Sequence, residues 1–197
     1  MNAPDPDALD SQDMARLAGG HDAALNDLME RHVERLFHYL CRALQDESDA
    51  ADLAQESFVR VFQNRARFDP NQKFSTWLYA IATNLVRSRY RWRSRHPQVS
   101  LDGVDQETGK EFGERFPSGA ATPSQSLEAN ERADTVRKSI AALPEELRVP
   151  LILAEYEELS QSEIAAILNC SVKAVETRIY RARKQLRQSL RPLRQTD

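Results

Sequence analysis

The chain has 197 residues, about two-fifths of them hydrophobic, so it can form one large or two small domains. It carries 27 Lys and Arg against 30 Asp and Glu, and its formal net charge is −3. This sum argues weakly against nucleic-acid binding, but the basic residues are concentrated. Five Arg lie within 87–96, and eight Lys or Arg lie within 171–195. The distribution predicts a moderately acidic protein that contacts a polyanion at two places.

Membrane insertion, secretion and metal chemistry find no support in the sequence. No apolar run approaches the ~18 residues of a transmembrane helix, and the amino terminus lacks the basic-then-apolar order of a signal peptide. We therefore expect a cytoplasmic protein with no membrane insertion. Cys41 and Cys170 have no second Cys or His at metal-ligand spacing, so we expect buried thiols, with a disulfide or a metal site as the alternative. The four His form no catalytic or ligand constellation, and we predict no metal, no cofactor and no enzymatic activity.

Three helices are predicted in the amino-terminal half. Apolar residues recur at three- and four-residue steps from Leu25 to Leu44, within Asp49–Phe62, and in a third helix that starts near Ser75. In the second of these, DAADLAQESFVRVF, the apolar stripe faces a core and the polar face is left outside. From periodicity alone, that polar face is simply solvated. The pattern leaves open whether the acidic segment Met1–Asp13 is ordered.

The third helix combines aromatic residues with arginines. It begins with FSTWLYAIATN and ends in the Arg-rich segment 87–96. Cations neutralise phosphates and ring faces stack on exposed bases, so Tyr79, Tyr90 and Trp92 beside these arginines suit unpaired nucleic acid. The alternative is that Trp77 and Tyr79 belong partly to the core.

A change of composition after His96 divides the chain. The segment 96–126 holds three Pro and four Gly without a sustained period, which predicts a long linker. Helical periodicity then returns up to Leu143, and Pro144 opens a further helix in which Pro150 is either a kink or the true start. The predicted fold is all-α, with two small helical domains joined by a flexible linker: residues 1–96, the linker 97–125 and residues 126–197.

The carboxy-terminal domain contains a helix-turn-helix pattern. Ser160 and Glu163 predict a capping box, in which each side chain bonds the backbone N–H of the other residue. Asn169 tolerates the left-handed conformation of a tight turn, and Ser171 can cap the next helix. The apolar face of that helix consists of Val175, Ile179, Ala182 and Leu186. The alternative is a basic, solvated hairpin without DNA, but the caps, the turn and the charge placement together favour DNA binding.

The second helix of this motif is expected to enter the major groove of DNA, which admits one helix. Its first turns carry the side chains placed to meet base edges: Lys173, Glu176, Thr177 and Arg178. Later turns carry residues that are better read as phosphate contacts, which position the helix without reading sequence: Arg181, Arg183, Lys184 and Arg187.

The order of these segments resembles a known family. DAADLAQESFVRVF, FSTWLYAIATNLVRSRYR, LPEELR and LSQSEIAAILNCSVKAVETRIYRARKQLR are similar, in order and spacing, to the extracytoplasmic-function (ECF) group of bacterial sigma factors, in the sigma-70 family. Sigma factors are initiation subunits of RNA polymerase. The resemblance therefore implies core RNA polymerase and promoter DNA, both duplex and melted, as partners. It also implies control by an anti-sigma factor.

The resemblance further implies roles for particular residues. Docking on the clamp coiled coil of the largest polymerase subunit is assigned to Asp49, Asp52, Gln55, Glu56 and Arg60. Recognition and melting of the minus-ten element are assigned to Asn84, Arg87 and Arg91, with the Phe68–Phe74 loop as a candidate pocket for a flipped base. Recognition of the minus-thirty-five element is assigned to Lys173, Glu176, Thr177, Arg178 and Arg181.

The sequence thus predicts a transcription initiation factor that lends promoter specificity to core RNA polymerase and has no chemistry of its own. Two alternative functions fit the sequence less well. A self-sufficient helix-turn-helix repressor or activator would leave the segment 49–62 without a role. An enzyme acting on nucleic acid would need a catalytic constellation that the His, Cys and acidic residues do not provide.

Overall fold

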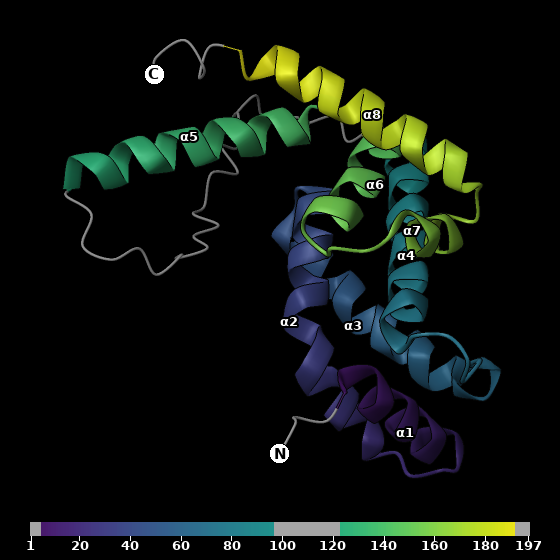
Figure 1. Ribbon diagram of the computed structural model, residues 1–197. Coiled ribbons are helices and arrows are strands. Elements are labelled where there is room, and N and C mark those ends of the chain that lie inside the picture. Colours follow the sequence, from purple (N-terminus) through teal and green to yellow (C-terminus); the bar gives the residue numbers. More distant parts are fainter. Residues whose placement is uncertain (1–4, 97–122, 192–197) are drawn as a thin grey trace.

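The computed structural model describes residues 5–96 and 123–191, and every regular element in these ranges is a helix. Figure 1 shows two groups of helices packed together, with α5 extending away from them. In chain order the elements are α1 (Pro6–Ala18), α2 (Ala24–Leu44), α3 (Glu47–Asn64), the 3-10 helix η1 (Arg65–Arg67), α4 (Phe74–Arg95), α5 (Pro123–Ala141), α6 (Glu145–Glu155), α7 (Gln161–Leu168) and α8 (Val172–Ser189). The predicted all-α fold with two helical domains is confirmed. Most of the predicted linker lies outside the described residues.

The amino-terminal group is built from α2, α3 and α4 around an apolar core. Leu36 of α2, Phe58 of α3 and Leu78 of α4 are at most 2% exposed, as their periodic spacing predicts. Inside this core the hydroxyls of Tyr39 and Thr83 share a hydrogen bond of 2.8 Å, which satisfies both groups away from water. The three helices form the frame on which the polar faces of α3 and α4 are displayed.

Helix α1 was not predicted, because ion pairs rather than a long apolar stripe hold much of it in place. Asp5 caps the helix by accepting a hydrogen bond from the backbone N–H of Asp7 at 3.1 Å. Asp10 is only 1% exposed, and its carboxylate accepts from Arg31 Nε at 2.9 Å and contacts His32 Nε2 at 2.7 Å. Burial on its own would raise the pKa of Asp10, but the hydrogen bonds and charges of His32 and Arg31 outweigh it and lower that pKa. The acidic segment is therefore ordered from Asp5 onward by contacts with α2.

Helices α7 and α8 form the helix-turn-helix with the predicted caps. The Glu163 backbone N–H donates to Ser160 Oγ at 3.3 Å, and the Ser160 backbone N–H donates to the Glu163 carboxylate at 2.8 Å. Asn169 adopts φ 50° and ψ 55°, the left-handed conformation that ends α7. Ser171 accepts from the backbone N–H of Ala174 at 3.2 Å and so caps α8. The capping box, the turn and the second cap are all confirmed.

Pro150 lies inside α6 rather than at its start. The helix begins at Glu145, after Pro144 as its N-cap residue, and its first turn carries Glu145 and Glu146 near the positive end of the helix dipole. Pro150 has no N–H to donate to the carbonyl of Glu146, so the helix lacks that one bond and continues to Glu155. The interpretation of Pro150 as the true helix start is therefore wrong.

Both cysteines are free thiols. Cys41 is buried as predicted, and burial raises the pKa of its thiol to about 12, whereas Cys170 is only half buried. Within the two described ranges, no group of His, Cys, Asp and Glu is arranged to hold a metal ion. In the same ranges no helix is long and apolar enough to cross a membrane.

The two groups of helices are in direct contact. Helix α7 packs against α4, and α6 packs against α2 (Figure 1). This contact brings the Arg-rich end of α4 close to the helix-turn-helix, although the two are separated by about seventy residues of sequence.

Candidate polymerase and nucleic-acid interface

The polar face of α3 carries the residues expected to bind polymerase. Asp52, Gln55 and Arg60 are exposed, and Glu56 is partly exposed. Arg60 Nε donates to the Glu56 carboxylate at 2.8 Å, one turn away on the same helix. Because water screens such an exposed pair, it is worth only a few tenths of a kcal/mol, and both side chains remain available to a partner.

Asp49 differs from the other members of this set because its charge is already paired within the chain. Its side chain is 13% exposed, and its carboxylate accepts from Arg89 at 2.7 Å and from Arg93 at 2.5 Å. Arg93 also donates to Asp46 at 2.8 Å. The first turn of α3 is thereby tied to the last turns of α4. This geometry gives Asp49 a role in positioning α4, and the contact of Asp49 with polymerase stays a prediction.

A hollow of about 280 Å³ lies where the end of α3 meets the first half of α4. Its lining combines basic, amide and aromatic side chains: Arg60, Asn64, Arg67, Trp77, Ile81 and Asn84. Asn84 therefore shares a cavity with Arg60, although the two were predicted to contact different partners. Asn64 and Arg67 carry no signal in the sequence that marks them as site residues, because they become neighbours of Trp77 only when α3 and α4 pack.

The Phe68–Phe74 loop, expected to hold a flipped base, borders this hollow through an aromatic cluster. The ring centroid of Phe68 lies 5.2 Å from that of Trp77 and 6.3 Å from that of Phe74. Phe74 is fully buried, whereas Phe68 and Trp77 are half buried. The loop turns through Asp69, whose carboxylate accepts from the backbone N–H of Asn71 at 2.9 Å. A half-buried ring pair beside a hollow that also carries arginine and amide groups suits a base that stacks on one side and forms hydrogen bonds on the other.

The three aromatic residues predicted to stack on bases lie in different environments. Tyr79 is 4% exposed, so the prediction that its ring is available to bases is wrong, and the alternative that it belongs to the core is confirmed. The hydroxyl of Tyr90 donates to the carbonyl of Ala43 at 2.6 Å, and its ring is half buried. Trp92 is 49% exposed and stacks on His96 with ring centroids 5.0 Å apart. Of the three, Trp92 has the ring that can still accept a base.

The exposed face of α8 groups most of the residues expected to read the minus-thirty-five element. Lys173 Nζ donates to the Glu176 carboxylate at 2.8 Å, and Thr177 Oγ1 donates to the carbonyl of Lys173 at 2.8 Å. Arg181 is exposed on the same side, since it lies two turns beyond Lys173. Arg178 is directed elsewhere: it is half buried, and its Nη1 lies 3.7 Å from the Sγ of Cys170.

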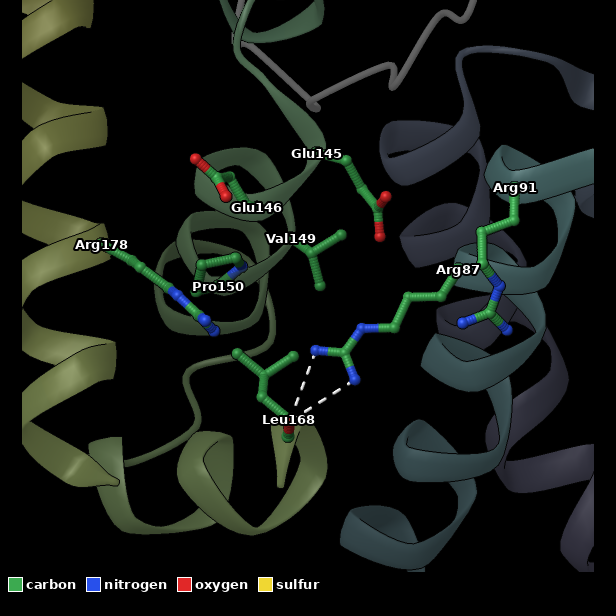
Figure 2. Close-up of a pocket in the computed structure, with 8 residues that line it drawn as sticks. All are labelled: Arg87, Arg91, Glu145, Glu146, Val149, Pro150, Leu168 and Arg178. Atoms are coloured by element: carbon green, nitrogen blue, oxygen red, sulfur yellow. Dashed lines mark hydrogen bonds between the residues drawn. The ribbon is translucent and has the colours of Figure 1, made fainter. Parts of the chain in front are cut away.

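Arg178 lines a second hollow, of about 240 Å³, between the two groups of helices (Figure 2). Arg87 and Arg91 reach this hollow from α4, and Glu145 reaches it from α6. Both terminal nitrogens of Arg87 donate to the carbonyl of Leu168, the last residue of α7, at 3.4 Å. Burial raises the pKa of Glu145 above its usual range, although the positive charge of Arg87 opposes that rise.

Most of the predicted site residues thus fall into three places. The face of α3 displays Asp52, Gln55, Glu56 and Arg60; the face of α8 displays Lys173, Glu176, Thr177 and Arg181; and the second hollow collects Arg87, Arg91 and Arg178. Asn84 lies in the first hollow. Along α4, Trp77, Ile81, Asn84 and Arg91 fall within about 80° of one another at 100° per residue, so one stripe of this helix connects the two hollows.

Comparison with known proteins decides what these surfaces belong to. The family model of sigma-70 region 2 matches residues 28–96, and that of sigma-70 region 4 matches residues 133–186. The ECF RNA polymerase sigma factor SigW of Bacillus subtilis is 36% identical over 88% of this chain and 92% of its own length. The chain belongs to the ECF group of the sigma-70 family. As an ECF sigma factor it directs core RNA polymerase to promoters and initiates transcription, and it is not an enzyme.

Other relatives agree. The RNA polymerase sigma-H factor of Pseudomonas aeruginosa is 32% identical over 93% of this sigma factor and 95% of its own length. Among solved structures, CnrH in complex with the cytosolic domain of CnrY has a TM-score of 0.67 and 28% identity, and covers 93% of this chain and 98% of that one. RpoE from Bartonella quintana, solved with the anti-sigma factor NepR, shares the fold with a TM-score of 0.68, at 22% identity over 86% of this chain and 98% of its own.

Proposed function

We propose a division of labour within this sigma factor. Residues 1–96 bind core polymerase and read and melt the minus-ten element, residues 97–125 connect the domains, and residues 126–197 read the minus-thirty-five element. The observation that carries the proposal is the pairing of two separate exposed faces, an acidic-polar one on α3 and a basic one on α8, with two hollows beside α4. One hollow collects Arg87 and Arg91 of α4, and the other places Asn84 of α4 beside Arg60 and Arg67. Each face suits a different macromolecular partner.

Polymerase binding is assigned to the face of α3. Asp52, Gln55, Glu56 and Arg60 supply donors and acceptors on the surface of α3. Within residues 5–96 and 123–191, the side-chain pair seen among them is the weak one between Glu56 and Arg60. Asp49 contributes mainly by holding α4 through Arg89 and Arg93. Such a mixed-charge face favours a partner surface that also carries both signs of charge.

Minus-ten recognition is assigned to Asn84, Arg87 and Arg91 of α4. An unpaired base can stack beside Trp77 and meet the amide of Asn84, which offers both donors and an acceptor to a base edge. Arg91, further along the same stripe, and Arg87, at its edge, neutralise the phosphates of the melted strand. Binding to unpaired bases then stabilises the open duplex at the expense of the closed one.

Minus-thirty-five recognition is assigned to α8. Lys173, Glu176, Thr177 and Arg178 occupy the first turns, which face base edges when a recognition helix enters the major groove, and Arg181 contacts phosphate. Glu176 accepts hydrogen bonds and so favours a cytosine amino group, while its pairing with Lys173 orients it before DNA binds.

Control by a protein partner and a cytoplasmic location belong to the same proposal. CnrH, 28% identical to this chain, was solved with the cytosolic domain of CnrY, and this supports an anti-sigma partner for the present protein. We place the protein in the cytoplasm because its partners, polymerase and promoter DNA, are there.

Run-off transcription on a genomic fragment library with purified core polymerase tests the proposal. Addition of the full chain should yield discrete transcripts whose upstream sequences share two elements, whereas core polymerase alone should not. Failure of the full chain to bind core polymerase in a pull-down would contradict the assignment of α3. Arg60→Ala should weaken the pull-down, with Arg67→Ala as a matched exposed control outside the polymerase set.

A further inference from the structure

A buried carboxylate stands at the contact between the two domains. The side chain of Glu157, in the turn between α6 and α7, is 1% exposed. Arg35 of α2 donates to its carboxylate through Nε at 2.8 Å and to its backbone carbonyl through Nη2 at 2.8 Å. The hydroxyl of Tyr79 on α4 donates to the same carboxylate, and the guanidinium of Arg42 lies 4.0 Å from it. The three side chains that contact this carboxylate, Arg35, Arg42 and Tyr79, thus all come from the amino-terminal domain.

The chemistry of these partners favours a durable contact. Burial, with the nearby Glu157 carboxylate, raises the pKa of the Tyr79 phenol, so its proton remains available for donation. The carboxylate of Glu157 accepts charge-assisted hydrogen bonds, which are stronger than hydrogen bonds between neutral groups. Because the carboxylate is sealed from water only while the domains touch, separating them requires water to replace Arg35 and Tyr79 together.

Other contacts join the same two domains, among them an ion pair of 3.2 Å between Lys73, which precedes α4, and Glu163 of α7. The guanidinium of Arg42 lies 4.3 Å from the ring centroid of Tyr156, in a cation–π arrangement. Arg148 of α6 donates to the hydroxyl of Tyr90 of α4 at 2.6 Å. The pair of hydrogen bonds from Arg87 to the end of α7, described above, also belongs to this interface.

This packing conflicts with simultaneous binding to both promoter elements. By their names the minus-ten and minus-thirty-five elements lie about 25 base pairs apart, or ~85 Å along DNA at ~3.4 Å per base pair. Yet Arg87 and Arg178, assigned to the two elements, line one cavity of about 240 Å³ (Figure 2). Arg87 is moreover engaged by the carbonyl of Leu168. The closed chain therefore cannot place both residues on DNA.

We propose that Glu157 is an interdomain latch that keeps the free sigma factor closed, with Arg35 and Tyr79 as its counterparts. The inhibitory consequence rests on the proposed function of Arg87 and Arg178, whereas the latch itself rests on the contacts alone. In the closed chain the α3 face stays exposed, so polymerase can bind there first. Opening of the latch then separates the domains and releases Arg87 from α7.

Charge reversal in the full-length chain tests the latch. Glu157→Arg places a cation against Arg35 and Arg42, and Arg35→Glu places an acid against Glu157, so each should open the chain. Small-angle X-ray scattering measures the result: a compact chain of this size has a radius of gyration of about 16 Å, and separation of the domains should raise the measured radius by about 5–10 Å. The double variant with both reversals should return the radius toward that of the wild type. Glu131→Arg, the same charge change at an exposed position of α5, is the matched control and should leave the radius unchanged.

The functional readout is the sigma concentration that gives half-maximal run-off transcription. If a tenth of wild-type molecules are open, an open variant should need roughly tenfold less protein. If both single variants keep their helix content by circular dichroism and have the same radius as the wild type, the latch is overturned. This holds whether all three proteins are compact or all three are extended. A larger radius with an unchanged half-maximal concentration overturns its inhibitory role. Transcription by none of the proteins, despite a larger radius in the variants, leaves the latch standing and refutes the proposed function instead.

Discussion

Replacement of Asp49 by alanine tests whether the main role of this residue is to position α4 or to contact polymerase. The Asp49 carboxylate joins α3 to α4 by accepting hydrogen bonds from Arg89 at 2.7 Å and from Arg93 at 2.5 Å. Asp49→Ala removes both bonds and leaves Arg93 paired with Asp46, whereas Arg89 loses its carboxylate partner. If positioning is the main role of Asp49, the first effect of the substitution is on stability.

The size of that effect follows from burial. Hydrogen bonds to charged groups contribute about 1.5–3 kcal/mol each when well shielded. Here Arg89 and Arg93 keep 30% and 37% of their side-chain surface exposed, so screening by water reduces the contribution to about 1 kcal/mol each. We therefore expect Asp49→Ala to lower the free energy of unfolding by about 2 kcal/mol. For a chain of this size that corresponds to a fall in melting temperature of roughly 4–8 °C.

Thermal unfolding followed by circular dichroism measures this loss, and Asp52→Ala is the matched control. Asp52 is exposed and lies on the same helix, so its substitution should change stability by no more than about 0.5 kcal/mol. In polymerase pull-downs the order should reverse, with Asp52→Ala the more damaging at a temperature where both variants are folded. An unchanged melting temperature for Asp49→Ala together with strongly weakened polymerase binding would refute the positioning role.

Three further predictions concern the DNA-reading surfaces and the cap of α7. Arg178→Ala should reduce promoter-specific run-off transcription and leave core polymerase binding unchanged in a pull-down; equal loss of both would contradict the division of labour. Trp92→Ala should weaken binding to a single-stranded oligonucleotide by about 1–3 kcal/mol in a fluorescence titration, without changing the melting temperature, because one exposed stacking surface is removed. The hydrogen bond from Ser160 lowers the pKa of Glu163 below 4.5, so the stability that this charge adds is complete above that pH and is lost as pH falls through the lowered folded-state value. The difference in unfolding free energy between wild type and Glu163→Gln should accordingly shrink in acid, and a pH-independent difference would argue against the carboxylate.

The helix-turn-helix was predictable because its determinants are local. The capping box of Ser160 and Glu163 spans three residues, and Asn169 marks the turn through its own backbone preference. The apolar face of α8 likewise follows from helical spacing alone, and Val175 and Ile179 are buried as expected. Such short-range signals depend only on neighbouring residues, so they do not change with the packing of the rest of the chain.

The features that sequence reasoning missed depend on partners distant in sequence. Helix α1 is held in place by the hydrogen bond from Arg31 to Asp10, and its sequence has no long apolar stripe from which the helix could be predicted. Tyr79 resembles a surface aromatic in an Arg-rich helix, but Glu157, seventy-eight positions later, covers it in the folded chain. The first hollow is similar, because Arg67 and Asn84 become neighbours only when α3 packs on α4. Periodicity identifies which face is buried, but it does not identify what a polar face will meet.

Several arginines of the basic segment 87–96 already have partners within the chain, and this lowers the number that can neutralise DNA phosphates. Of the five arginines within 87–96, Arg89 and Arg93 are paired with acids of α3, and Arg87 donates to a carbonyl of α7. Since each phosphate neutralised on a single strand contributes about −0.7 to the slope of log affinity against log salt, the closed chain should show a shallower slope than five arginines imply. Opening the chain returns Arg87 to this count without touching the acid-paired arginines. An increase of about one phosphate in the salt dependence of single-strand binding therefore reports domain opening through electrostatics, independently of the radius of the molecule.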